Sequence, residues 1–259
     1  SVICKNKPKR FGAETKKAND RMARILRSPS DLTTSDLRKV YDCFDSPIAR
    51  LDCGKKCAPH NPNGKPFCCD ICHAVPAAYK SEWNYFQGAT NLWHRYRGKE
   101  CEGSDSLDTG RPLQDSDLPS GMIFLACLGP DQCQRDYRAF CCRAFPFFPY
   151  ITSDYRFLGL ACEWEMETTC WVISNLGAVT EDYRVEFLRT FDNLLALFDD
   201  VFENYAFHSE RLRAHAISQK KRFPLLHRNG HAYLVSPASE RMQKVELSQL
   251  PKIGLYETT

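Results

Sequence analysis

The sequence lacks any apolar run of the roughly 18 residues that a membrane-spanning helix needs. It also lacks a surplus of charge of one sign, because 35 Lys and Arg against 32 Asp and Glu leave a formal net charge of only +3. Domains whose main role is to bind nucleic acid usually carry a strong basic surplus. We therefore expect neither a membrane span nor nucleic acid as the main partner.

Motifs of the common enzyme classes are missing as well. The chain contains no Gly-rich phosphate loop, no G-x-S-x-G nucleophile elbow and no H-E-x-x-H zinc motif. It shows no internal repeat and no low-complexity tract, and residues 179–259 contain no cysteine. The distinctive chemistry of this sequence is therefore that of the 14 cysteines in the rest of the chain, and a catalytic residue cannot be singled out among them.

Disulfides are not needed to stabilise a chain of this size. A chain of 259 residues can bury a sizeable core without crosslinks. Fourteen cysteines in this length is also below the roughly 8–10% that marks a small disulfide scaffold. The opening segment, residues 1–7, does not have the pattern of a signal peptide. We therefore expect a reducing, cytoplasmic setting, with a secreted disulfide-rich binding protein as the alternative.

Composition divides the chain into three zones. Residues 1–50 have the pattern of a helical segment, residues 51–178 are rich in Cys, Pro, Gly and aromatic residues, and residues 179–259 combine helical periodicity with a hairpin signal. We expect these zones to pack as one globular unit. The predicted fold class is α+β, with a loop-rich, metal-centred core of short strands flanked by helices and a C-terminal hairpin.

Periodicity and turn signals predict individual elements. The most secure prediction is one long amphipathic helix over 182–205, where apolar residues recur with a period near 3.6. Asn229-Gly230 between two apolar runs predicts a hairpin, because both residues tolerate a positive φ. Further helices are expected at 18–26, at 34–46, at 77–86 and after Thr90, strands at 122–127, 155–162 and 170–174, and an exposed loop at 103–117.

The first group of cysteines contains five thiols within twenty residues. They are separated by a Pro- and Gly-rich stretch, 59–66, which predicts a compact turned loop. Such a loop can point several sulfurs at one ion. Lys55 and Lys56 would favour the thiolate form, which is the metal ligand. The members of this group are Cys53, Cys57, Cys68, Cys69 and Cys72.

The second group is Cys127, Cys133, Cys141 and Cys142, and Cys162 and Cys170 form a looser third group. Arg138 and Arg143 are expected to offset the negative charge of a multi-thiolate site. An aromatic shell of Phe140, Phe145, Phe147 and Phe148 is expected to exclude water from it. Cys4, Cys43 and Cys101 stand alone and are expected to be buried or surface thiols. The predicted metal ligands are Cys53, Cys57, Cys68, Cys69, Cys72, Cys127, Cys133, Cys142 and Cys162.

Part of this pattern resembles a known family. Cys53 to Cys72, followed by Cys127, by Cys133-Gln-Arg-Asp-Tyr-Arg and by Cys142-Arg-Ala-Phe-Pro-Phe, resembles the YkgJ-like cysteine-cluster family, whose members are described as zinc- or iron-chelating proteins. The resemblance covers roughly residues 51–150. Flagellin lysine N-methylases share related cysteine patterns, which implies a cluster-dependent enzyme that modifies a protein or peptide as an alternative function.

The nature of the centre is predicted from the number of thiols. A structural zinc takes four ligands, so the two tight groups exceed one zinc site, and we favour an iron–sulfur cluster over zinc. The expected role is redox chemistry, electron transfer or metal handling, with an unidentified protein or redox partner.

Three other interpretations remain open at this point. Cys69-Asp-Ile-Cys72-His73 matches the C-x-x-C-H pattern of c-type haem attachment, which makes a haem protein a further alternative. His60 or His73 could replace a thiolate as a ligand. Glu163, Glu165 and Glu167 would share one face of a strand, where they could bind a cation or act as a base.

Overall fold

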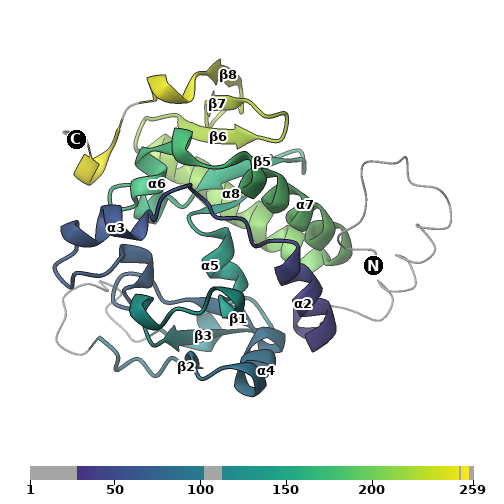
Figure 1. Ribbon diagram of the computed structural model, residues 1–259. Helices are drawn as coiled ribbons and strands as arrows, with labels where there is room; N and C mark the ends of the chain where they lie inside the picture. Colours follow the sequence, from purple (N-terminus) through teal and green to yellow (C-terminus); the bar gives the residue numbers. More distant parts are fainter. Residues whose placement is uncertain (1–27, 102–112, 251, 257–259) are drawn as a thin grey trace. The chain divides into compact units, whose positions relative to one another are not determined.

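The computed structural model describes residues 28–101, 113–250 and 252–256, and its fold is α+β, as predicted (Figure 1). The chain forms two compact units, each assembled from separated segments. Unit 1 contains the described residues up to Asp45, Cys68–Arg143 and Asp192–Phe202. Unit 2 contains Ser46–Phe67, Ala144–Phe191 and the described residues from Glu203 onward. Each unit therefore takes residues from more than one of the composition zones.

Unit 1 is built around a three-stranded antiparallel sheet. Strand β3 (Met122–Cys127) lies between β1 (Ala77–Tyr79) and β2 (Trp93–Arg95), so the predicted strand over 122–127 is confirmed. The segment after Thr90 was predicted as a helix, and this prediction is wrong. Trp93 pairs with Cys127 instead, and these ladder hydrogen bonds connect residues too far apart for a local pattern to reveal.

Helices and aromatic rings complete unit 1. Helix α2 (Thr34–Asp42) lies within the helix predicted over 34–46 and ends earlier than predicted. Its N-cap is Thr33, whose hydroxyl accepts a hydrogen bond from the Asp36 amide at 3.2 Å. Helix α4 (Lys80–Ala89) begins three residues later than predicted, after β1. The Phe86 ring on α4 stacks on Trp93, with ring centroids 5.5 Å apart. These contacts form an aromatic core against the sheet.

Unit 2 contains a five-stranded antiparallel sheet in the order β4-β5-β6-β7-β8. The predicted hairpin is confirmed, with Gly230 at φ +87 in its turn. Leu212 and Ala216 of helix α8 pack with side chains from four of the strands, so this helix covers one face of the sheet. The strands are β4 (Phe147–Ile151), β5 (Phe157–Cys162), β6 (Phe223–His227), β7 (Ala232–Val235) and β8 (Met242–Val245).

The helix predicted over 182–205 is two helices, α7 (Glu181–Leu197) and α8 (Asp199–Ser218). They are separated only at Phe198, which is fully buried in the core. Asp199 and Asp200 follow this residue, and acidic side chains favour the first turn of a helix. The prediction was therefore right about the helical content and wrong about its continuity.

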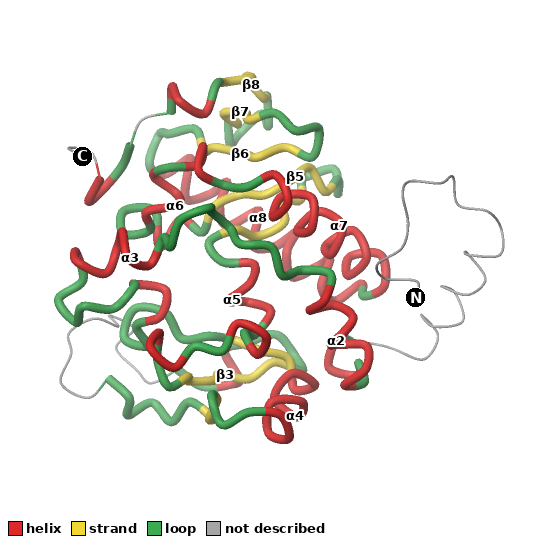
Figure 2. The backbone as a smooth tube through the Cα atoms, viewed as in Figure 1, coloured by secondary structure: helices red, strands yellow, loops and turns green. Residues whose placement is uncertain are grey.

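Short helical turns replace two other predicted features. The strand predicted over 170–174 is helix α6 (Trp171–Ser174). Glu163, Glu165 and Glu167 do not share a strand face either, since Trp164–Met166 form a 3-10 turn. Figure 2 shows that loops and short helices, including α3 (Gly54–Cys57), make up most of the chain between α2 and β1.

Two predicted segments fall wholly or partly outside the description. The helix predicted over 18–26 and most of the loop predicted over 103–117 lie outside the described residues. Among the helices of the described ranges, none combines the length and apolar character needed to cross a bilayer.

Candidate metal centre

The described cysteines differ in their bonding. Cys72 forms a disulfide with Cys101, with Cα atoms 5.4 Å apart, and Cys43 is also disulfide-bonded. This differs from the sequence analysis, which took Cys72 as a metal ligand and expected Cys43 and Cys101 to be thiols. The 29-residue separation between Cys72 and Cys101 carries no local signal that they meet. The cysteines outside disulfides in the described ranges are Cys53, Cys57, Cys68, Cys69, Cys127, Cys133, Cys141, Cys142, Cys162 and Cys170.

Unit 1 brings Cys69, Cys127, Cys133 and Cys142 together, and we call these four residues the unit 1 thiol cluster. Burial raises the pKa of Cys127, and the neighbouring sulfurs of Cys142, Cys69 and Cys133 raise it further. An electrostatic influence of this kind places the four sulfurs in one region of unit 1. They come from the end of a 3-10 turn over 67–69, the end of β3, the loop after it and helix α5 (Phe140–Ala144). The tertiary fold of unit 1 therefore brings sulfurs from four local elements into one region.

Arg138 supplies positive charge to the unit 1 thiol cluster. Its Nε donates a hydrogen bond to the Cys133 Sγ at 3.1 Å. Burial lowers the pKa of Arg138, but the hydrogen bond to Cys133 and the nearby Cys142 and Cys69 sulfurs outweigh it and raise the pKa overall. The charge partner that the sequence predicted at Arg138 is therefore in place beside the sulfurs.

Two members of the cluster belong to vicinal pairs. The sulfurs of Cys68 and Cys69 lie 4.0 Å apart, and so do those of Cys141 and Cys142. The pKa of Cys142 is raised well above its ordinary value, first by the hydrogen bond with Cys141 and then by burial. Cys69 and Cys142 belong to the unit 1 thiol cluster. Cys68 and Cys141 are their respective neighbours in the two vicinal pairs.

The unit 1 thiol cluster has donor atoms suited to a metal, but its side chains are not arranged in a coordination geometry. Within the ranges that the structure describes, no three His, Cys, Asp or Glu side chains are arranged to hold a metal ion as they stand. Raised pKa values also mean that the Cys127 and Cys142 thiols are protonated at neutral pH. A metal would have to displace these protons, as it does in other thiolate sites. Four soft sulfur donors with an adjacent guanidinium match the chemistry of iron–sulfur or zinc binding.

Arg143 has a different place from the one that the sequence suggested. Its guanidinium is buried and donates to the Phe44 carbonyl at 2.8 Å, to the Asp136 carbonyl at 3.0 Å and to the Arg138 carbonyl at 3.1 Å. It also lies over the Tyr41 ring, 4.5 Å from the centroid. Arg143 therefore holds the backbone of several segments together and orients the residue that contacts Cys133.

Glu82 is a second positioning residue that the sequence analysis missed. Its buried carboxylate accepts hydrogen bonds from the Tyr41 hydroxyl at 2.5 Å and from the Phe140 amide at 2.7 Å. Phe140 begins α5, the helix that carries Cys142. The Glu82 carboxylate on α4 thus fixes the start of α5. The sequence gives no sign of this role, because only burial in the folded chain distinguishes Glu82 from the other glutamates.

The expected aromatic shell is divided between the two units. Phe140 is buried in unit 1, and its ring lies edge-on to Phe44 with centroids 6.0 Å apart. Phe147 and Phe148 belong to β4 of unit 2, where Phe147 contacts Tyr183 and Phe148 contacts Trp164. These two rings point to opposite faces of β4, and both pack in the core of unit 2 because every residue of this strand is buried.

Unit 2 contains the remaining thiols outside disulfides in the described residues: Cys53, Cys57, Cys162 and Cys170. Cys53 and Cys57 lie one helical turn apart, since the Cys57 amide donates to the Cys53 carbonyl at 3.3 Å. Burial raises the pKa of Cys170 to about 12, with smaller contributions from the Cys53 and Cys57 sulfurs. The predicted ligands therefore separate into a group in unit 1 and a group in unit 2.

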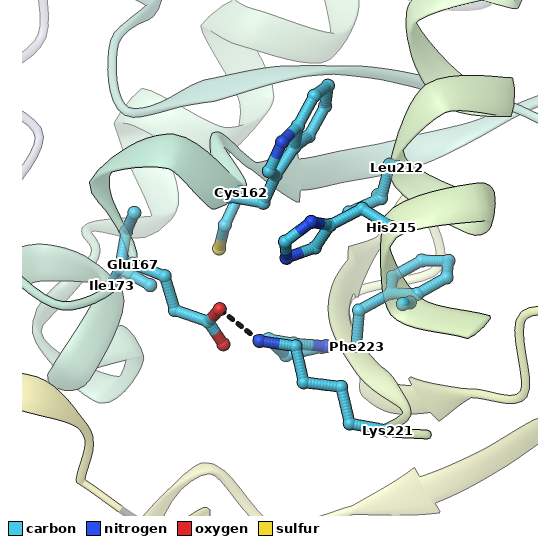
Figure 3. Close-up of a pocket in the computed structure, with 10 residues that line it drawn as sticks. Cys162, Glu167, Ile173, Leu212, His215, Lys221 and Phe223 are labelled. Carbon is cyan, nitrogen blue, oxygen red and sulfur yellow. Dashed lines mark hydrogen bonds and ion pairs between the residues drawn. The ribbon is translucent and has the colours of Figure 1, made fainter. Parts of the chain in front are cut away.

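Cys162 faces a small cavity in unit 2 of about 20 Å³ (Figure 3). Its sulfur points into the same space as the His215 imidazole and the ion pair between Glu167 and Lys221. The rest of the wall is mainly apolar, including Leu212. A volume of this size holds about one water molecule, so it does not admit an organic substrate.

We expect the Cys162 thiol to be nearly inert in the folded protein. Burial raises its pKa well above the ordinary value, and alkylation requires the thiolate. Iodoacetamide at pH 8, followed by mass spectrometry, should modify Cys162 at least roughly 100-fold more slowly in the native chain than in urea. Equal rates in the two states would show that the thiol is accessible and ionised.

The haem-attachment pattern does not have two available thiols in this structure. Cys72 is in the disulfide with Cys101, which leaves Cys69 as the only thiol of Cys69-Asp-Ile-Cys72-His73 outside a disulfide. The His73 Nε2 lies 3.9 Å from an oxygen of Asp70. Haem attachment would require reduction of this disulfide, because it uses both sulfurs for thioether bonds.

Comparisons of the chain with protein-family models, with curated proteins and with solved structures find no match. The resemblance to the YkgJ-like family therefore remains a prediction from the spacing of a few residues.

Proposed function

We propose that this chain binds a metal centre through Cys69, Cys127, Cys133 and Cys142, and that the centre is an iron–sulfur cluster in preference to zinc. The observation that supports the proposal is the unit 1 thiol cluster: four sulfurs from separated stretches act on one another beside the Arg138 guanidinium. Its expected role is redox chemistry, electron transfer or metal handling in the cytoplasm, with a protein or redox partner.

The residues of unit 1 would contribute in three ways. The four thiolates would bind the metal, and a bound cluster would supply one-electron chemistry. Arg138 would offset part of the negative charge, and its hydrogen bond to Cys133 would raise the reduction potential. Burial of Cys127 and Cys142 would limit access of water to the sulfurs. An iron–sulfur cluster is favoured because its thiolate ligands would bind different iron ions and so need not all converge on one ion.

An enzymatic role is the extension of this proposal. The resemblance to flagellin lysine N-methylases implies a cluster-dependent enzyme that modifies a protein or peptide. We assign no catalytic residue to such a reaction. The cavity beside Cys162 holds about one water molecule, so a protein substrate would have to react elsewhere on the chain.

A second candidate is a disulfide-containing binding protein without metal. The Cys72–Cys101 disulfide favours it, because such bonds persist mainly in oxidising compartments. In this case the vicinal pairs and the remaining thiols would become oxidised partners of one another. The two candidates differ in the number of reduced thiols and in metal content.

Metal analysis of the full chain, purified without oxygen, tests both candidates. We expect iron and acid-labile sulfide in stoichiometric amounts, with broad visible absorbance that is lost on exposure to air. Stoichiometric zinc in a colourless protein would support the thiol site and overturn the preference for iron. A sharp Soret band would indicate haem. A metal-free protein with titratable thiols would contradict metal binding, and a metal-free protein with few thiols would support the disulfide candidate.

A further inference from the structure

The five-stranded sheet of unit 2 has two edges that differ in how they are covered. At the β4 edge, Pro149 has no amide hydrogen, and the main chain of Ile151 is bonded to α8. The Ile151 amide donates to the Ser209 hydroxyl at 2.9 Å, and its carbonyl accepts from the Arg213 guanidinium at 3.0 Å. The opposite edge is β8, whose neighbour is β7 and which lies at the outer end of the sheet (Figure 1). An open edge is a template on which another strand can pair.

The register of β8 determines which of its main-chain groups point outward. The Ser236 amide donates to the Arg241 carbonyl at 2.9 Å, and Val235 lies opposite Met242. In an antiparallel pair, residues that exchange hydrogen bonds with the neighbouring strand alternate with residues that do not. The amides and carbonyls of Met242 and Lys244 therefore point away from β7. Among the residues that the structure describes, these four groups have no hydrogen-bond partner.

The side chains along β8 carry an excess of positive charge. Arg222, Arg241 and Lys244 are exposed, and Glu246, directly after the strand, is the opposing charge. The Arg222 guanidinium donates to the Gln243 side chain at 2.5 Å, so it lies beside β8. None of these three cations forms an ion pair within the described ranges. Two copies of this edge would repel each other, whereas an acidic segment would be attracted.

This charge is present on both faces of the strand. Successive side chains of a strand point to opposite faces, so Gln243, with the Arg222 guanidinium beside it, lies on one face and Lys244 on the other. A segment that pairs with β8 therefore meets a cation on each face. Acidic residues at neighbouring positions would match this edge better than acidic residues at every second position.

The turn before β8 is anchored, which holds the edge in place. Glu240 accepts hydrogen bonds from the Tyr150 hydroxyl at 2.6 Å and from the Ser153 hydroxyl at 2.5 Å. It also forms an ion pair with Arg213 at 3.2 Å. Because this carboxylate has its own partners, it does not neutralise the adjacent Arg241. A partner would therefore bind an edge that is already ordered, which lowers the entropic cost of binding.

We propose that β8 binds an extended acidic segment of a partner protein, which adds a strand to the sheet of unit 2. The main chain of this segment would exchange hydrogen bonds with Met242 and Lys244. Its carboxylates would pair with the three exposed cations. In this mode of recognition, main-chain hydrogen bonds supply affinity and side chains supply specificity. The inference goes beyond the proposed function and does not depend on it, because it uses no cysteine.

Fluorescence anisotropy of a labelled peptide tests the proposal on the full chain. The probe is a fluorescein-labelled peptide of Glu-Glu-Thr-Val repeats, which should bind wild type saturably. Lys244→Glu replaces attraction by repulsion and should weaken binding by at least about 10-fold. Met242→Pro removes an outward amide without removing a hydrogen bond to β7, and it should also weaken binding by at least about 10-fold. Lys99→Glu is the matched control, because it makes the same change of charge at an exposed lysine of unit 1, and it should bind like wild type.

Two further probes separate strand addition from attraction between charges. The same peptide with methylated main-chain amides keeps its charge but cannot donate hydrogen bonds, so it should bind at least about 10-fold more weakly. Equal binding of the two peptides, equal weakening by Lys99→Glu and Lys244→Glu, or no binding by wild type would overturn strand addition at β8. A single-stranded oligonucleotide of equal charge that displaces the probe as effectively as unlabelled peptide would contradict a protein partner. If circular dichroism shows that Met242→Pro is unfolded, the methylated peptide and Lys244→Glu decide the question.

Discussion

Replacing Cys142 with serine is expected to release the metal from unit 1, whereas replacing its neighbour Cys141 should leave it bound. Zinc-finger peptides gain roughly 10–16 kcal/mol from four ligands, so each ligand accounts for about 3 kcal/mol. Cys142→Ser should therefore weaken metal binding by at least about 100-fold. Metal content after gel filtration, read from the visible absorbance and by elemental analysis, measures the effect.

The vicinal pairs make this a closely matched comparison. Cys141 and Cys142 are adjacent on α5, with sulfurs 4.0 Å apart, but it is Cys142 that acts on Cys127. Cys69→Ser against Cys68→Ser repeats the test at the other pair, and Cys68 is a ligand that the sequence predicted. Equal losses from both members of either pair would contradict the assignment of one ligand to each pair.

Replacing Arg143 with methionine is expected to destabilise unit 1 by about 3–5 kcal/mol. Methionine fills much of the same volume but leaves several buried carbonyls, including those of Phe44, Asp136 and Arg138, without their charged donor. Each unsatisfied buried carbonyl costs about 1–3 kcal/mol, and part of this cost is recovered by relaxation and water. Urea denaturation followed by tryptophan fluorescence gives the free energy of unfolding.

Arg135→Met is the control for this prediction. Arg135 lies beside Asp45 like Arg143, but its side chain is 43% exposed, and exposed ion pairs contribute about 0–1 kcal/mol. Comparable losses of stability in the two variants would show that Arg143 does not hold unit 1 together. A loss of metal binding in Arg143→Met without a loss of stability would instead place this side chain in the site itself.

Local signals in the sequence predicted a substantial part of the fold. The apolar run over 122–127, the helical spacing of Leu37, Val40 and Tyr41 in α2 and the Asn229-Gly230 turn each depend on neighbours within a few residues. The structure has these elements where they were expected, and the α+β class follows from them. Interactions of this range are decided by backbone preferences that a short window contains.

Predictions failed where distant contacts override local preference. The segment after Thr90 has helical character, but pairing of Trp93 with Cys127 makes it a strand. Residues 170–174 include the β-branched Val172 and Ile173, yet Trp171–Ser174 form α6, in which Ser174 accepts a hydrogen bond from the Ile253 amide. In both cases the decisive partner lies more than thirty residues away in the chain.

The candidate metal centre also combines features that local sequence signals predicted with features that distant contacts decided. From the amino acids alone, periodicity and turn signals predicted an α+β fold. The abundance and spacing of cysteine predicted a metal centre with a charge partner at Arg138. Only the tertiary structure decided that Cys72 pairs with Cys101, that Cys69, Cys127, Cys133 and Cys142 lie in unit 1, and that Cys53, Cys57, Cys162 and Cys170 lie in unit 2. Fourteen identical side chains carry no local mark of their partners, because which sulfurs meet depends on how distant segments of backbone pack.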